Sequence, residues 1–124
     1  MNYKYLENGV DNIFKDNFFV HVDPRIASKE DLFNFYYHAM WFPGYFGFNL
    51  DALYDFLCDL SWINKRKIII LHDKIPGMNE VDMRKYLSLL NDVCASWSDK
   101  ANSEHEIQIY FNYKDKEIIE ELIE

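Results

Sequence analysis

The stretch Lys67-Ile68-Ile69-Ile70-Leu71-His72 decides the fold. Its aliphatic run is far too short to cross a bilayer, which takes about 20 residues. A brief continuous apolar run of this kind is typical of a strand in a parallel sheet that helices cover. The sequence therefore predicts an α/β protein in which helices connect parallel strands.

The flanking sequence supplies the other elements, through apolar residues at strand or helix spacing. Ser28 with Asp31 three residues on resembles a capping box, and Asn49 is a second N-cap. The expected order is a strand at 18–22, a helix at 29–40, a helix from Asn49 that carries Leu50, Leu53, Leu57 and Leu60, a strand at 67–72, a helix at 80–97 and a strand at 106–111. This β-αα-β-α-β order predicts a small three-stranded parallel sheet with helices packed against it.

The 124 residues fit a single domain over 1–124, with a core at about 18–111. Residues 1–17 are expected to be an N-terminal extension with a turn at Asn8-Gly9. Residues 113–124 are expected to form a C-terminal helix with one apolar face, which carries Ile118, Ile119, Leu122 and Ile123. That face covers either the protein's own sheet or a second copy, and the sequence leaves both open.

The charge balance excludes several kinds of partner. Twenty-one acidic and thirteen basic residues give a net charge of −8. Such a chain is poorly suited to nucleic acid or to an anionic membrane surface, both of which require positive charge. The N-terminus lacks a signal-peptide pattern, so we expect a cytoplasmic protein in which Cys58 and Cys94 stay reduced.

The second predicted helix carries an acidic row, made by Asp51, Asp55 and Asp59. Residues four apart lie on one face of a helix, and adjacent like charges there cost roughly 0.2–0.5 kcal/mol per pair. Asp51 falls in the first turn, where the helix dipole favours an anion, whereas Asp59 falls in the last turn, where it does not. A solvated helix face and a binding site both explain this spacing.

The loop before this helix favours the binding site. Five aromatic residues fall within eight positions there, Trp41, Phe42, Tyr45, Phe46 and Phe48. We expect Phe42 and Phe46 to enter the core, because a short loop usually lies at the surface and cannot bury all five. Exposed aromatic side chains beside carboxylates suit a protein interface.

Residues 42–55 read Phe-Pro-Gly-Tyr-Phe-Gly-Phe-Asn-Leu-Asp-Ala-Leu-Tyr-Asp and resemble the signature of the barstar family, the intracellular inhibitors of the ribonuclease barnase. That signature runs proline, any residue, tyrosine, aromatic, glycine, any residue, asparagine, leucine, aspartate, alanine, leucine, aromatic, aspartate. The strict match covers about twenty positions. The expected order of strands and helices extends the resemblance more loosely over residues 18–111.

The resemblance implies an inhibitor that blocks a basic ribonuclease toxin in a 1:1 complex, without cofactor or metal. The barstar helix enters the nuclease cleft, where its aspartates take the place of RNA phosphates. By similarity, Asp55 is the principal anion and Asp51 the second. Tyr45 matches the loop tyrosine, and Tyr54 fills the place of an interface tryptophan. Gly47, Phe48, Asn49 and Asp59 complete the expected partner-binding set. Barnase and barstar are themselves the standard example of electrostatic steering.

Several departures bear on the identity of the toxin. Asp59 stands where barstar has glycine, and Leu60 where barstar has tryptophan. A further interface carboxylate of barstar matches either Asp92 or Asp99. These departures leave open a toxin other than barnase, with a differently shaped cleft, and they leave its substrate, RNA or DNA, undecided.

Two other functions compete with inhibition. An enzyme is disfavoured because the four histidines are dispersed along the sequence and no metalloprotease, EF-hand, phosphate-loop or nucleophile-elbow motif occurs. The stronger alternative is a barstar-like interaction module whose partner is not a nuclease, since a fold alone does not fix function.

Overall fold

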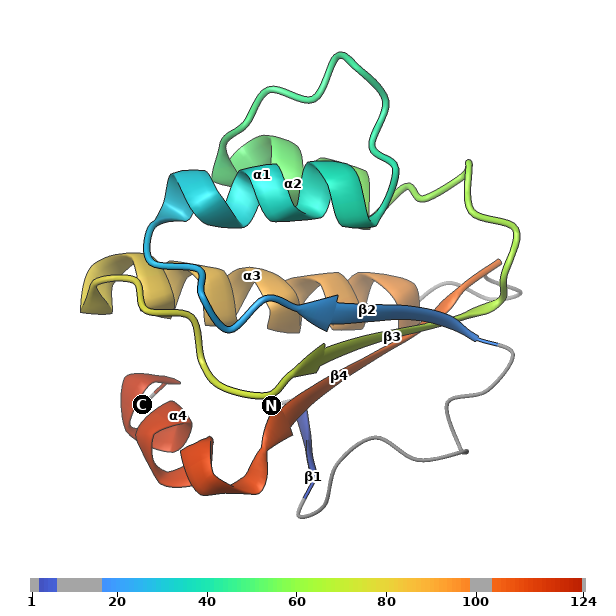
Figure 1. Ribbon diagram of the computed structural model, residues 1–124. Coiled ribbons are helices and arrows are strands. Elements are labelled where there is room, and N and C mark those ends of the chain that lie inside the picture. The colour runs from blue at the N-terminus through green and yellow to red at the C-terminus, as the bar shows by residue number, and fades with distance from the viewer. Residues whose placement is uncertain (1–2, 7–16, 99–103, 124) are drawn as a thin grey trace.

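Strand β3 (Lys67–His72) lies inside a parallel sheet, as its continuous apolar run predicts. The computed structural model describes residues 3–6, 17–98 and 104–123. The other elements are β1 (Tyr3–Leu6), β2 (Phe18–Val22), α1 (Lys29–Ala39), α2 (Leu50–Leu57), α3 (Glu80–Ser98), β4 (Glu106–Asn112), a 3-10 turn (Tyr113–Asp115) and α4 (Lys116–Ile123). Helices α1, α2 and α3 lie on one side of the sheet, and α4 lies beside the end of β4 (Figure 1).

The sheet has four strands rather than the predicted three, in the order β1-β4-β3-β2. All neighbouring pairs are parallel. The additional strand is β1, which pairs with β4 so that Tyr3 lies opposite Ile109. The expectation of an extension outside the fold is therefore wrong for residues 3–6, while Asn8-Gly9 lies outside the described residues. The Tyr3 hydroxyl donates to the backbone oxygen of Leu87 in α3, which ties β1 to the core.

Helix α2 is shorter than predicted, because it ends at Leu57 instead of continuing to Leu60. Leu60 has a left-handed backbone with φ 51°, yet its side chain is fully buried. Ring nitrogens from outside the helix bind carbonyl oxygens at this end. Trp97 Nε1 donates to Leu57 O at 2.8 Å, and His105 Nε2 lies 2.9 Å from Leu60 O. Leu57 and Leu60 are thus both buried, as their spacing predicts, although the helix ends between them.

The C-terminal helix packs on its own domain. Ile119 is fully buried, and Leu122 and Ile123 are half-buried against the main core. Arg84 Nη1 of α3 donates to Leu122 O at 2.9 Å. Ile118 departs from the predicted apolar face, since 47% of it is exposed.

A buried polar chain runs through the core between α1, α3 and the sheet. His72 is fully buried, with Nδ1 3.0 Å from Tyr110 O and Nε2 2.7 Å from the Tyr86 hydroxyl. The Tyr86 hydroxyl lies 2.6 Å from that of Tyr36. Burial holds the pKa of His72 down at about 4, an effect that the bond to Tyr110 opposes. The histidine is therefore a neutral part of the core, and none of its ring contacts reaches α2.

Candidate functional site

The loop before α2 is anchored by an aromatic cluster. Phe42 and Phe46 are buried, as the sequence predicts, with 5% and 4% exposed. Their ring centroids lie 4.9 Å apart, and each lies 5.1 Å from the ring of Phe56 in α2. A turn closes this cluster, in which Phe46 N donates to Pro43 O at 3.1 Å. The loop is thus fixed directly against the helix that carries the aspartates.

Three other aromatic residues of the loop face solvent. Tyr45 is 75% exposed, Trp41 65% and Phe48 42%. The Tyr45 ring lies 5.2 Å from that of Phe56, so Tyr45 stands beside α2. Trp41 and Phe48 have φ of 55° and 51°, a left-handed conformation that side chains other than glycine rarely adopt. Large exposed rings on such a backbone are uncommon, and backbone strain of this kind tends to occur at functional sites.

Asn49 and Gly47 shape the start of α2. The Asn49 Oδ1 accepts a hydrogen bond from Ala52 N at 2.8 Å, which caps the helix, and Asn49 Nδ2 donates to Gly47 O at 3.2 Å. A Cβ on Gly47 would lie 3.2 Å from Asn49 Nδ2, tighter than an ordinary contact. Both residues therefore have a local structural role, whatever they contact in a partner.

Asp51 and Asp55 lie one turn apart on the exposed side of α2. The opposite side carries Leu53 and Leu57, which are fully buried. In the described part of the chain, neither carboxylate makes an ion pair or hydrogen bond. Asp59 falls beyond the helix, exposed, and accepts a hydrogen bond from Ser61 N at 3.3 Å. The row on the helix therefore contains two carboxylates rather than three.

Helix α3 brings another carboxylate to this surface. A hollow of about 280 Å³ separates α2 from α3, lined by Leu50, Asp51, Tyr54, Lys85, Ser88, Leu89 and Asp92. Of the two candidates for the additional carboxylate, Asp92 lies beside Asp51, and Asp99 lies outside the described residues. A hydrogen bond with the Cys58 thiol raises the pKa of Tyr54, which keeps its phenol protonated next to these acids.

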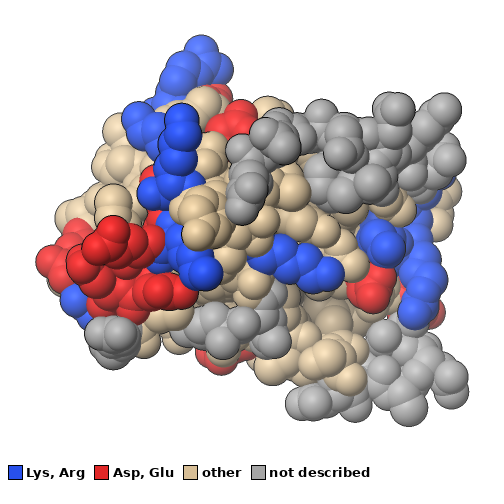
Figure 2. Space-filling view, turned by 90° about the horizontal axis from the view of Figure 1, so that it is seen from below, with Lys and Arg blue, Asp and Glu red and all other residues tan. Residues whose placement is uncertain are grey.

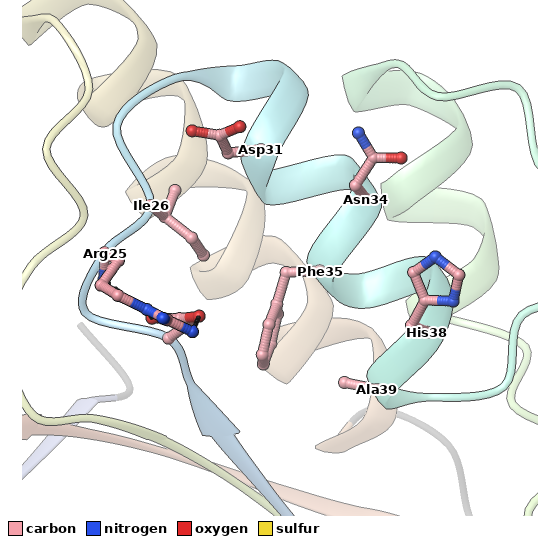
Figure 3. A pocket seen from close by; sticks show the side chains of 8 residues that line it. Arg25, Ile26, Asp31, Asn34, Phe35, His38 and Ala39 are labelled. Atoms are coloured by element: carbon pink, nitrogen blue, oxygen red, sulfur yellow. Dashed lines mark hydrogen bonds and ion pairs between the residues drawn. The ribbon is translucent and has the colours of Figure 1, made fainter.

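A larger hollow lies elsewhere on the described surface. It measures about 760 Å³ and is lined by Asp23, Arg25, Ile26, Asp31, Asn34, Phe35, His38 and Ala39 (Figure 3). None of these residues belongs to α2 or to the loop before it. Two of its charged groups pair with each other, since Arg25 Nη2 donates to Asp23 Oδ2 at 2.9 Å. This hollow is therefore separate from the acidic surface of α2.

Catalytic and metal-binding groups do not gather around the aspartates of α2. Within the described residues, no three His, Cys, Asp or Glu side chains are placed to hold a metal ion. His21 pairs with Asp73 at the ends of β2 and β3, while His72 and His105 are buried. Burial raises the pKa of the Cys94 thiol to about 11, so this thiol is poorly suited to nucleophilic chemistry.

The model of one protein family, described as Barstar (barnase inhibitor), matches residues 17–112. The chain belongs to the barstar family. The matched residues run from β2 to β4 and include the aromatic loop and both aspartates of α2, while β1 and α4 lie outside them. Members of the barstar family are inhibitors of barnase-type ribonucleases rather than enzymes. No curated protein matches the sequence. None of the described helices is both long and apolar enough to span a membrane.

Proposed function

We propose that this chain is a cytoplasmic immunity protein that binds one molecule of a cognate basic ribonuclease toxin and closes its active site. Asp55 and Asp51 take the places of RNA phosphates in the cleft, and Tyr45 and Tyr54 pack beside them. The observation that carries this proposal is the pair of exposed carboxylates on α2, which make no ion pair with any described residue and lie beside exposed aromatic residues, in a chain of the barstar family.

The chemistry of the two carboxylates suits such a partner. A ribonuclease cleft is built to hold phosphates with positive groups, so an exposed carboxylate without a partner of its own can bind there without breaking an existing ion pair. Tyrosine adds contact area with few rotatable bonds, which is why it is frequent among residues that dominate binding energy. Phe48, 42% exposed, extends this surface towards α1.

Charge on the far side of the sheet is mixed. Figure 2 shows this underside, where Lys and Arg side chains are spread over the face and a cluster of Asp and Glu side chains lies at one edge. The proposed contact therefore rests on the carboxylates of α2 and not on repulsion of a basic nuclease from the underside.

Capture with the tagged chain from its native host, followed by a binding assay on the recovered nuclease, tests the proposal. We expect Asp55→Ala to weaken binding by about 2–5 kcal/mol, the usual cost of removing one partner of a buried charge pair. Barnase–barstar is itself one of the complexes on which that range is based. Glu121→Ala on α4 is the matched control, because it removes one carboxylate from a distant helix and should change binding by less than about 0.5 kcal/mol.

Three outcomes contradict the proposal. Equal effects of Asp55→Ala and Glu121→Ala place the interface away from α2. Recovery of a partner without nuclease activity, or of a nuclease that binds RNA and the inhibitor at the same time, favours an interaction module with another function.

A further inference from the structure

We infer that two copies of this chain associate through the outer edge of β2, with Trp41 of each copy seated in the hollow of about 760 Å³ of the other. Three observations carry this inference. They are the unprotected edge of β2, the exposed ring of Trp41 at one end of that edge, and the hollow at the other end. The surface is separate from the acidic side of α2, so the inference does not depend on the proposed function.

Strand β2 forms one edge of the sheet, and within residues 3–6, 17–98 and 104–123 no strand pairs with its outer side. Edge strands present backbone N–H and C=O groups that pair readily with another strand, and proteins usually protect them with lysine, proline or a covering segment. The other edge, β1, has such protection, because it contains Lys4 and the Lys116 ammonium of α4 lies 5.7 Å from the Tyr5 ring. The sequence of β2, Phe-Phe-Val-His-Val, contains neither lysine nor proline.

Trp41 is an exposed ring at the start of this edge. Trp41, Phe48 and Leu60 are the described residues other than glycine with a left-handed backbone. Leu60 is buried in the core and Phe48 belongs to the proposed toxin surface, but neither explanation applies to Trp41, which is 65% exposed. The Trp41 ring meets that of Phe18 edge-on, with the centroids 5.1 Å apart. Phe18 packs against the main core together with Val20, so Trp41 stands on the side of the sheet that the helices cover.

The hollow lies at the other end of β2, on the same side of the sheet. It begins at Asp23, the residue after the strand, and continues along α1, whose first turn lies above the end of β2 and whose last turn lies above its start (Figure 1, Figure 3). Ile26, Phe35 and Ala39 supply its apolar lining. Arg25 lies beside them, and Asp23 holds its guanidinium through Nε at 3.0 Å and Nη2 at 2.9 Å. This combination suits an indole, which packs on apolar groups and attracts a guanidinium to its face.

A two-fold axis at the edge of β2 brings the ring and the hollow together. When two copies of β2 pair antiparallel, the start of one strand lies opposite the end of the other. Trp41 of each copy then meets the hollow and Arg25 of the other copy, so the same contact forms twice, as a two-fold interface requires. The axis runs perpendicular to the sheet, so the helices of both copies lie on one side and the two sheets become one. This self-complementarity favours a second copy over an unrelated strand as the occupant.

Sedimentation equilibrium of the purified chain, from about 1 μM to about 1 mM, tests the inference. We expect a monomer–dimer equilibrium. Trp41→Ala should raise the dissociation constant of the dimer at least about tenfold, because a tryptophan seated in a pocket is often a dominant contact. Arg25→Ala should raise it by a smaller factor. Tyr45→Ala is the matched control and should change it by less than about twofold, since it removes an exposed ring of the same loop that lies against Phe56 instead of Phe18.

Two further readouts follow from the same geometry. Each copy carries a net charge of −8, so the copies repel each other and added salt should strengthen the dimer. Hydrogen exchange at the amides of residues 18–22 should slow as the concentration of wild type rises, because the outer amides of β2 become bonded to the other copy. The same amides of Trp41→Ala should exchange at a rate that does not depend on concentration.

Three outcomes overturn the inference. The first is a chain that stays monomeric up to about 1 mM, which leaves the edge of β2 to a different partner. The second is a dimer that Trp41→Ala and Arg25→Ala leave intact. The third is a dimer whose amides at residues 18–22 exchange as fast as those of the monomer. Melting temperatures of the variants at about 1 μM should match that of wild type, which separates a lost contact from a lost fold.

Discussion

The buried imidazole of His72 should make the fold sensitive to mild acid. Its pKa lies near 4 in the native protein, against about 6.5 for an ordinary histidine, because burial disfavours the charged ring. Between these values the unfolded chain binds a proton that the native protein does not. The free energy of unfolding therefore falls as the pH drops from about 6.5 towards 4, and this contribution is fully present only above about 6.5.

The size of the effect follows from the difference between the two pKa values. A difference of about 2.5 pH units at 1.36 kcal/mol per unit gives a loss of about 3 kcal/mol at pH 4. Small domains have unfolding free energies of about 5–15 kcal/mol, so this loss is readily measured. Carboxylates add their own acid sensitivity, and the assay must separate the two contributions.

Urea unfolding of wild type and His72→Gln at several pH values between 7 and 4 separates the contribution of His72 from that of the carboxylates. Glutamine can still donate to Tyr110 O and accept from Tyr86, but it does not titrate, so the variant should show a flatter pH dependence. His38→Gln, which removes an exposed imidazole, is the control and should follow the wild type. If wild type and His72→Gln lose stability in parallel, the buried neutral histidine is not the source of the acid sensitivity.

Three further predictions concern association, the helix cap and the first strand. Association with the nuclease should slow as salt rises, since exposed charges are screened over about 8 Å at 0.15 M salt; stopped-flow rates insensitive to salt would contradict steering. Asn49→Ala should lower the free energy of unfolding by about 1 kcal/mol, because it removes the cap of α2. Asn49→Asp keeps the oxygen that accepts from Ala52 N but loses the donor to Gly47 O, so in urea unfolding it should cost less than Asn49→Ala. Tyr3→Phe should also cost about 1 kcal/mol, through the lost bond to Leu87 O; unchanged stability would mean that this hydrogen bond does not stabilise β1 against α3.

Local sequence patterns predicted the central elements well. The apolar run at 68–71 predicted β3 with its observed bounds. A strand that is buried on both faces does not need alternating apolar and polar residues, so a continuous apolar run indicates it. The burial of Phe42 and Phe46 was likewise predicted, since a short loop with five aromatic residues must bury some of them. The signature at 42–55 indicated Asp51 and Asp55, which are exposed and make no ion pair within the described residues, and their role in binding stays a prediction.

Features that depend on distant residues were not predictable. Strand β1 has four residues, and its partner β4 begins about a hundred residues later, so no local pattern reveals the pairing. The side chains of Trp97 and His105 bind carbonyl oxygens at the end of α2. The spacing of Leu57 and Leu60 carries no information about these distant residues. For the same reason the four-residue spacing predicts Asp59 on the helix, whereas Asp59 lies beyond its end. The proximity of Asp92 to Asp51 required the packing of α3 against α2.

The pairing of β1 with β4 also determines when the first strand can join the sheet during synthesis of the chain. Tyr3 leaves the ribosome early, but Ile109, its partner in the ladder, is added 106 positions later. At a synthesis rate of about 5–20 residues per second, the first strand waits roughly 5–20 s without its neighbour. This edge of the sheet therefore forms only after β4 has been synthesised, and under the proposed function the speed of translation limits how soon inhibition of the nuclease can begin.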